Sequence, residues 1–124
     1  MGGVKRPTLG LIVREPYASL IVDGQKTWEI RKRKTHHRGP LGILTGGLLI
    51  GQAEVVGVEG PFTVEDLLPH WDKHRAEEAF LRAYAKEAPL YAWVLKNAFR
   101  YEKPLVVPRR PGRVIFVDLS GVPW

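Results

Sequence analysis

Apolar and polar residues alternate over several stretches of the chain, and this period of two is typical of β-strands. In the segment 27–33, Trp28 and Ile30 occupy one track, while Glu29 and Arg31 occupy the other. We expect the apolar track to face the core, and the two charged side chains to start roughly 6.6 Å apart on the opposite face. Further strands are predicted over residues 8–14, 41–45, 48–58, 90–95 and 113–119, with an extended segment at 104–108.

Two regions interrupt this alternation and are predicted to be helical. Residues 16–23 are apolar on nearly every side, with a proline in the first turn and Gly24 after the last, which predicts a short buried helix. In the second region, residues 63–87, Thr63 and Asp66 have the spacing of a capping box. This region is expected to form a helical excursion between two strands.

The sheet is expected to curl, because Gly51 and Gly57 interrupt the strand predicted over 48–58 and such glycines often mark bulges. A curled sheet of short strands favours a small, mostly antiparallel barrel over a flat sheet. With no linker or repeat in its 124 residues, the chain is predicted to form a single α+β domain, residues 1–124.

The composition is that of an ordinary globular protein, with 44% hydrophobic and 26% charged residues. The absence of cysteine excludes disulfides and cysteine nucleophiles, and it favours a reducing, cytoplasmic setting. The apolar runs are far shorter than the roughly 20 residues that cross a bilayer, so no membrane partner is expected.

Positive charge is concentrated in one segment. The net charge is +6, and residues 24–39 carry six basic side chains and one acid, Glu29. A concentrated basic patch on an otherwise nearly neutral chain is typical of proteins that bind nucleic acid or phosphate. We expect Lys32, Arg33, Lys34, His37 and Arg38 to contact an RNA backbone, although a solvated strand end would have the same composition.

The single acid forms a candidate ligand site with two of the cations. Lys26, where the helix-to-strand turn ends, is expected to be free to lean toward either face of the strand that carries Glu29 and Arg31. A carboxylate between two cations stays ionised at neutral pH, so Glu29 would accept hydrogen bonds from a ligand's amino group while the cations hold a phosphate or carbonyl. The alternative is that Glu29 is an ion-pair partner that keeps Arg31 in place.

Three further residues near this segment are candidates for binding. Tyr17 and Ser19 lie on the short helix and are included in the ligand site, Tyr17 as an aromatic on which a base would stack. Ser19 would equally bond its own backbone. Trp93 lies within the apolar run LYAWVL, so core filling is the better interpretation for it.

No metal site or cofactor is predicted. A second helix of the excursion is expected to run from Asp72 to Ala88, and His74 and Glu78 would share one of its faces with His70 close by. No fourth ligand accompanies them, and a solvated helix face is the better interpretation.

The run EPYASLIVDGQKTWEIR, followed by HHRGPLGI, resembles the ASCH-domain family, whose fold is similar to the PUA-type β-barrel. YAWVLKNAFRYEKPL also looks like the family's Trp-containing strand, so the resemblance spans most of the chain, with 61–88 the least diagnostic part. The family's pattern of Pro-aromatic-Ala-Ser, Gly-x-Lys-x-x-Glu-x-Arg and Arg-Gly falls here on Pro16, Tyr17, Ala18, Ser19, Gly24, Lys26, Glu29, Arg31, Arg38 and Gly39.

The resemblance implies RNA binding in a cleft lined by the Lys, Glu and Arg. One branch resembles amidohydrolases that deacetylate acetylcytidine with a Lys, a Thr and a distant Glu, and other members have been proposed as ribonucleases. Here Glu29 replaces that Thr, and Thr27 would face the site only by strand parity. The amidohydrolase motif is therefore incomplete.

We predict a small, mostly antiparallel, PUA-like barrel that binds RNA or a nucleotide. The alternative is a hydrolase acting on a modified nucleoside or on RNA, with Lys26 as base or electrostatic stabiliser. It ranks second because acid–base work needs a lowered pKa at Lys26, which Glu29 would oppose. A protein-interaction module, the third possibility, would need an exposed apolar patch.

Overall fold

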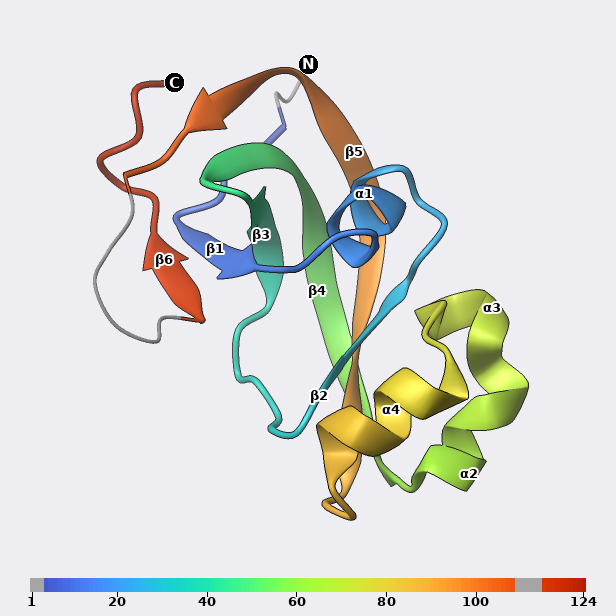
Figure 1. Ribbon diagram of the computed structural model, residues 1–124. Helices are drawn as coiled ribbons and strands as arrows, with labels where there is room; N and C mark the ends of the chain where they lie inside the picture. Colours follow the sequence, from blue (N-terminus) through green and yellow to red (C-terminus); the bar gives the residue numbers. More distant parts are fainter. Residues whose placement is uncertain (1–3, 109–114) are drawn as a thin grey trace.

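The computed structural model describes residues 4–108 and 115–124, which form a six-stranded sheet and four short α-helices (Figure 1). The strand order is β2-β5-β4-β3-β1-β6, and β1 pairs with β3 in parallel while the other pairs are antiparallel. The strands are β1 (Leu9–Ile12), β2 (Trp28–Arg31), β3 (Gly39–Thr45), β4 (Leu48–Phe62), β5 (Leu90–Val106) and β6 (Phe116–Asp118).

The predicted barrel is not closed, because β2 and β6 each pair with one neighbour in the described residues. Helical residues cover the outer edge of β2 instead: the Thr27 N–H donates to the Lys73 carbonyl at 2.9 Å, and the Lys26 ammonium donates to the Trp28 carbonyl at 2.7 Å. The bulges do occur where glycines predicted them, since the β4–β5 register shifts before both Gly51 and Gly57. Of the predicted last strand, residues 113–114 lie outside the described residues.

The short helix α1 (Tyr17–Val22) falls within the predicted segment and buries Ala18, Ile21 and Val22. It packs very closely on the sheet at Gly51. A Cβ atom built on Gly51 would overlap the Phe99 carbonyl oxygen and lie 2.7 Å from Val22 Cγ1. Glycine at this bulge therefore lets α1 approach the sheet.

The helical excursion consists of α2 (Val64–Leu67), a 3-10 turn (Leu68–His70), α3 (Trp71–His74) and α4 (Glu78–Ala85). The capping box is present, with Thr63 N–H donating to Asp66 Oδ2 at 2.9 Å and Asp66 N–H donating to Thr63 Oγ1 at 3.1 Å. The single long helix predicted from Asp72 is wrong, because Arg75 adopts a left-handed conformation with φ of 60° that ends α3.

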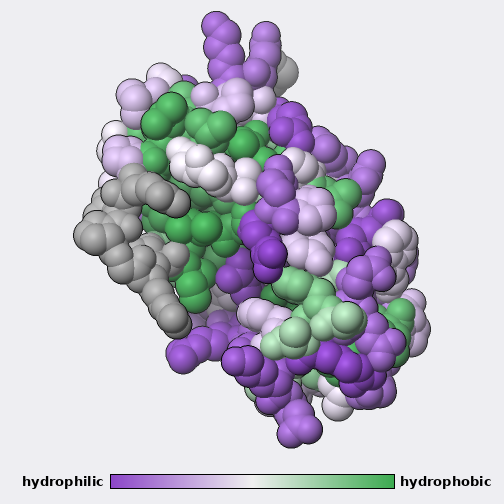
Figure 2. All heavy atoms as spheres, in the orientation of Figure 1, coloured by the Kyte–Doolittle hydropathy of each residue, from purple (hydrophilic) through white to green (hydrophobic). Residues whose placement is uncertain are grey.

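The helical block has its own apolar core against one face of β2. Trp28 and Ile30 pack there with Leu67 and Leu81, as the alternation along β2 predicted for these two residues. Figure 2 shows that the outer surface of this block is largely hydrophilic, while apolar residues gather over the β1–β3 part of the sheet. Among the described helices, none has the length and apolarity needed to span a membrane.

Substituting Gly51→Ala is expected to lower the free energy of unfolding by about 1 to 3 kcal/mol, because the added methyl group overpacks the α1–sheet contact. Gly57→Ala is the matched control, since a Cβ there would meet nothing within 4 Å. Urea unfolding of the two variants checks this. Equal stabilities would contradict the close approach of α1.

Candidate functional site

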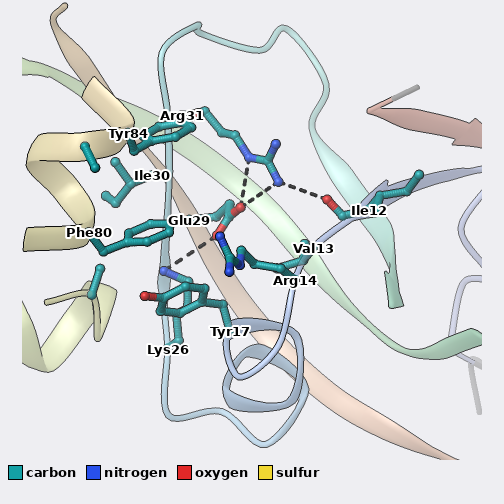
Figure 3. Close-up of a pocket in the computed structure, with 12 residues that line it drawn as sticks. Ile12, Val13, Arg14, Tyr17, Lys26, Glu29, Ile30, Arg31, Phe80 and Tyr84 are labelled. Atoms are coloured by element: carbon teal, nitrogen blue, oxygen red, sulfur yellow. Dashed lines mark hydrogen bonds and ion pairs between the residues drawn. The ribbon is translucent and has the colours of Figure 1, made fainter. Parts of the chain in front are cut away.

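A cleft of about 550 Å³ opens between the β1–α1 connection, β2 and α4 (Figure 3). Three groups of side chains line it. Glu29 and Arg31 project from β2 with Lys26 beside them, Tyr17 comes from α1, and Phe80 and Tyr84 come from α4. Ile12, Val13 and Arg14 complete the opposite wall.

Lys26 lies at the bottom of this arrangement and is only 3% exposed. Its ammonium donates to the Trp28 carbonyl at 2.7 Å and to the His74 carbonyl at 2.6 Å, and it lies 3.5 Å from Glu29 Oε1. Two of the three ammonium protons are thus donated to carbonyls, and the Glu29 carboxylate forms an ion pair with the same group. The expectation that Lys26 is free to lean was wrong, because α3 supplies a carbonyl that fixes it.

Glu29 connects the two cations of the predicted site. Its Oε1 faces Lys26, while Oε2 accepts from Arg31 Nε at 2.8 Å and also lies 2.8 Å from Arg31 Nη2. Arg31 Nη2 further donates to the Ile12 carbonyl at 3.1 Å. Within the described residues Arg31 Nη1 has no partner, so Glu29 orients Arg31 and leaves one of its nitrogens available in the cleft.

Burial lowers the pKa of Lys26 below its ordinary value, and the neighbouring Glu29 only partly opposes this shift. The opposing effect of Glu29 that the sequence predicted is therefore present, but burial of Lys26 is the larger effect and the pKa falls.

Aromatic rings form the wall opposite Arg31. The Tyr17 ring lies 5.2 Å from that of Phe80, and Phe80 lies 6.1 Å from Tyr84 with the ring planes nearly parallel. The Arg14 guanidinium stands 5.4 Å over the Phe80 ring and has no ion pair among the described residues. Burial raises the pKa of Tyr17, with Arg14 acting in the opposite direction.

Sequence reasoning missed Arg14, Phe80 and Tyr84 as site residues. Arg14 comes shortly before the Pro-aromatic-Ala-Ser motif, and its proximity to that motif was an available signal. Phe80 and Tyr84 are four residues apart on one helical face, a spacing that is also typical of core packing. Both are half-buried and line the cleft.

Ser19 does not line the cleft, contrary to its assignment to the ligand site. Its Oγ donates to Glu15 Oε2 at 2.6 Å, and its N–H donates to Glu15 Oε1 at 2.8 Å. The Glu15 carboxylate thus satisfies the first turn of α1, and Ser19 serves the helix. Thr27 is also absent from the lining residues.

The basic segment continues from the mouth of the cleft. Lys32, Arg33 and Lys34 are exposed and form no ion pair with any described residue. The Lys32 ammonium lies 5.0 Å over the ring of Tyr84, which lines the cleft, and Lys34 lies 5.6 Å over Tyr91. Lys32 therefore adjoins the aromatic wall of the cleft, and Lys34 lies over a ring outside it.

The end of the segment is a loop held by its own polar groups. Arg38 Nη1 donates to the carbonyls of Thr35 and His37 at 2.8 and 2.9 Å, and the His37 ring contacts the Pro40 carbonyl at 2.8 Å. Arg38 is exposed and pairs with no carboxylate among the described residues, whereas His37 is half-buried. The loop presents Arg38 more openly than His37.

Two residues considered as alternatives are structural. Trp93 is 3% exposed in the core, as preferred, and its Nε1 donates to the Arg33 carbonyl at 2.8 Å. His74 is fully buried, so the expected solvated face was wrong. Its Nδ1 accepts from the Ala76 N–H at 2.9 Å, which leaves Nε2 to donate to the Leu67 carbonyl at 2.7 Å. No group of His, Asp and Glu suited to a metal ion occurs in the described residues.

Comparison with known proteins identifies the family. A family model described as the ASCH domain matches residues 11–105. The crystal structure of ASCH from Zymomonas mobilis superposes with a TM-score of 0.74 at 18% identity, covering 91% of this chain and 87% of that one. A serine-to-alanine mutant of ZmASCH from the same organism gives 0.75 at 19% identity, covering 91% and 88%. At this sequence identity, the similarity to the two crystal structures concerns the fold alone. A search of curated proteins found no significant match.

Replacing Lys26→Met is expected to lower the free energy of unfolding by about 3 to 5 kcal/mol, because it leaves two buried carbonyls without a donor and removes one of the two cations beside the buried Glu29. Lys96→Met, at an exposed position of β5, serves as control and is expected to change stability by less than about 0.5 kcal/mol. Denaturant unfolding measures both. Similar stabilities of the Lys26→Met and Lys96→Met variants would show that the buried ammonium of Lys26 does not stabilise the fold.

Stability is expected to fall as the pH is lowered below 6.5, the ordinary pKa of His74, because burial lowers the pKa of this histidine in the fold. Below this pH the unfolded chain binds a proton at His74 and the folded chain does not. The free energy of unfolding then falls by about 1.4 kcal/mol per pH unit for this one group. His74→Gln is expected to flatten this dependence between pH 7 and 5, while His36→Gln in the exposed loop keeps it. If the free energy of unfolding of the wild type and both variants changed equally with pH, His74 would not be the group responsible.

Proposed function

We propose, from the premise that this chain belongs to the ASCH domain family, that it binds RNA or a nucleotide in the cleft beside β2. One observation carries this proposal. Four exposed cations, Lys32, Arg33, Lys34 and Arg38, extend from the mouth of an aromatic-lined cleft without a carboxylate partner among the described residues. Unpaired cations in a row release counterions when they meet a phosphate backbone.

The cleft itself offers groups suited to one nucleotide. Tyr17, Phe80 and Tyr84 provide ring surfaces for a base, which stacks on aromatic side chains irrespective of its sequence. Arg14 and Arg31 Nη1 provide charged donors for a phosphate. A carboxylate oxygen of Glu29 retains a lone pair that would accept from an exocyclic amino group.

Lys26 has a positioning role in this proposal. Its protons are directed to two carbonyls and Glu29, so it orients the acid that in turn orients Arg31. The hydrolase alternative needs Lys26 to exchange a proton with a substrate, and the same contacts oppose that use. Thr27, the threonine next to Lys26 in the sequence, does not line the cleft. Binding is therefore the function we prefer.

A salt titration of binding to short single-stranded RNA tests the proposal. If the four exposed cations and Arg14 contact about five phosphates, log affinity should fall by roughly 3.5 per decade of salt. Replacing Lys32, Arg33 and Lys34 together by Gln removes three contacts, and the slope should fall to roughly 1.4.

The control for this titration replaces Lys86 and Lys96 by Gln, because both are exposed lysines outside the basic segment. The salt dependence of RNA affinity in this control variant should remain that of the wild type. Absence of binding at low salt would refute the proposed function, and an unchanged slope in the triple variant would remove the basic segment from it.

A further inference from the structure

A second aromatic groove lies on the outer half of β5, away from the cleft. Phe99, Tyr101 and Lys103 occupy alternate positions of the strand and so share one face. With Arg6 and Trp124 they line a cavity of about 290 Å³, which shares no lining residue with the cleft. This volume is at the lower end of the range for small-molecule sites, so it suits one planar group rather than a larger ligand.

The rings of the groove are held in place before any ligand arrives. The Tyr101 hydroxyl donates to Gln52 Oε1 at 2.6 Å, and Gln52 Nε2 donates to the Lys5 carbonyl at 3.0 Å. Tyr101 lies 5.7 Å from the Phe99 ring and 5.9 Å from the Trp124 ring. A fixed central ring between two others lowers the entropy lost when a further planar group enters.

The outer rings are open to solvent and accompanied by positive charge. Phe99 is 36% exposed and Trp124 is 39% exposed. The Arg6 guanidinium stands 5.2 Å over the Trp124 ring, and Lys103 lines the same groove. Among the described residues that line it, none carries a carboxylate side chain. Aromatic faces interleaved with Arg and Lys form the combination that single-strand nucleic-acid readers use.

We propose that this groove stacks one nucleobase of a single-stranded RNA, with Arg6 and Lys103 on the adjacent phosphates. The inference rests on the proposed function and extends it to a second contact on the same strand. In the sheet Glu29 lies opposite Trp93, and Tyr101 lies eight residues further along β5. The distance between Trp93 and Tyr101 is at most roughly 26 Å, because the register shifts and the positive φ of Asn97 shorten the path relative to an extended strand. A strand of about 12 nucleotides, within the site sizes of such readers, would reach both.

Charge argues for RNA over a second copy of the chain. In a symmetric dimer the same patch meets itself, so Arg6 and Lys103 would approach their own counterparts across the interface. Like charges so placed oppose association. A phosphate backbone complements both cations and leaves the rings for its bases.

The test uses an oligouridylate of about 12 nucleotides and the double variant Phe99→Leu with Trp124→Leu. Stacking on aromatic side chains contributes enough per base that we expect affinity to fall at least about 10-fold. The salt slope should stay that of the wild type, since no phosphate contact is removed. Arg6→Gln with Lys103→Gln should instead lower the slope by roughly 1.4.

Trp71→Leu is the matched control, because Trp71 on α3 is 45% exposed and lies outside both sites. It should bind as the wild type does, and thermal unfolding should confirm that all variants fold. If the wild type binds RNA and the Phe99/Trp124 variant binds equally well, the groove proposal alone is overturned. Sedimentation showing a dimeric wild type and a monomeric double variant would also overturn it. Failure of the wild type to bind RNA removes both proposals.

Discussion

The buried ammonium of Lys26 is the interaction on which the cleft depends. Removing a charge from water costs several kcal/mol, and the cost is met only when every proton finds an acceptor. Here the acceptors are the Trp28 carbonyl on β2, the His74 carbonyl at the end of α3, and Glu29. One side chain thereby joins the edge of the sheet to the helical block and directs an acid into the cleft.

The same network continues across the cleft to its opposite wall. Glu29 fixes Arg31, and Arg31 reaches the Ile12 carbonyl at the end of β1. Because β2 and β1 are not neighbours in the sheet, this guanidinium is a polar bridge between strands that backbone pairing does not join. The sequence left open whether Glu29 is structural or binds a ligand. In this geometry a structural role leaves room for the other, because its ion pair with Arg31 uses Nε and Nη2 and leaves Nη1 without a partner among the described residues.

What the sequence predicted well was local. The opposite orientations of Trp28 and Glu29, the capping box at Thr63 and the bulge at Gly51 follow from spacing within a few residues. What it missed depends on partners distant in the chain. Lys26 meets a carbonyl 48 residues away, which no local pattern encodes. The open sheet was missed for the same reason. Its β2 edge is covered by α3, which is distant from β2 in the sequence. Ser19 is the exception, since its partner Glu15 lay one turn before it.

The position of the single acid divides the basic segment into a paired part and an unpaired part. Glu29 neutralises the cations nearest to it, one of which is buried, and these define the shape of the cleft. The cations after it form no ion pair with any described residue and remain exposed. A second acid placed among Lys32 to Lys34 would pair with them and reduce the positive potential of this surface. The uneven distribution of charge therefore separates a rigid ion-pair network from an adjacent exposed basic surface.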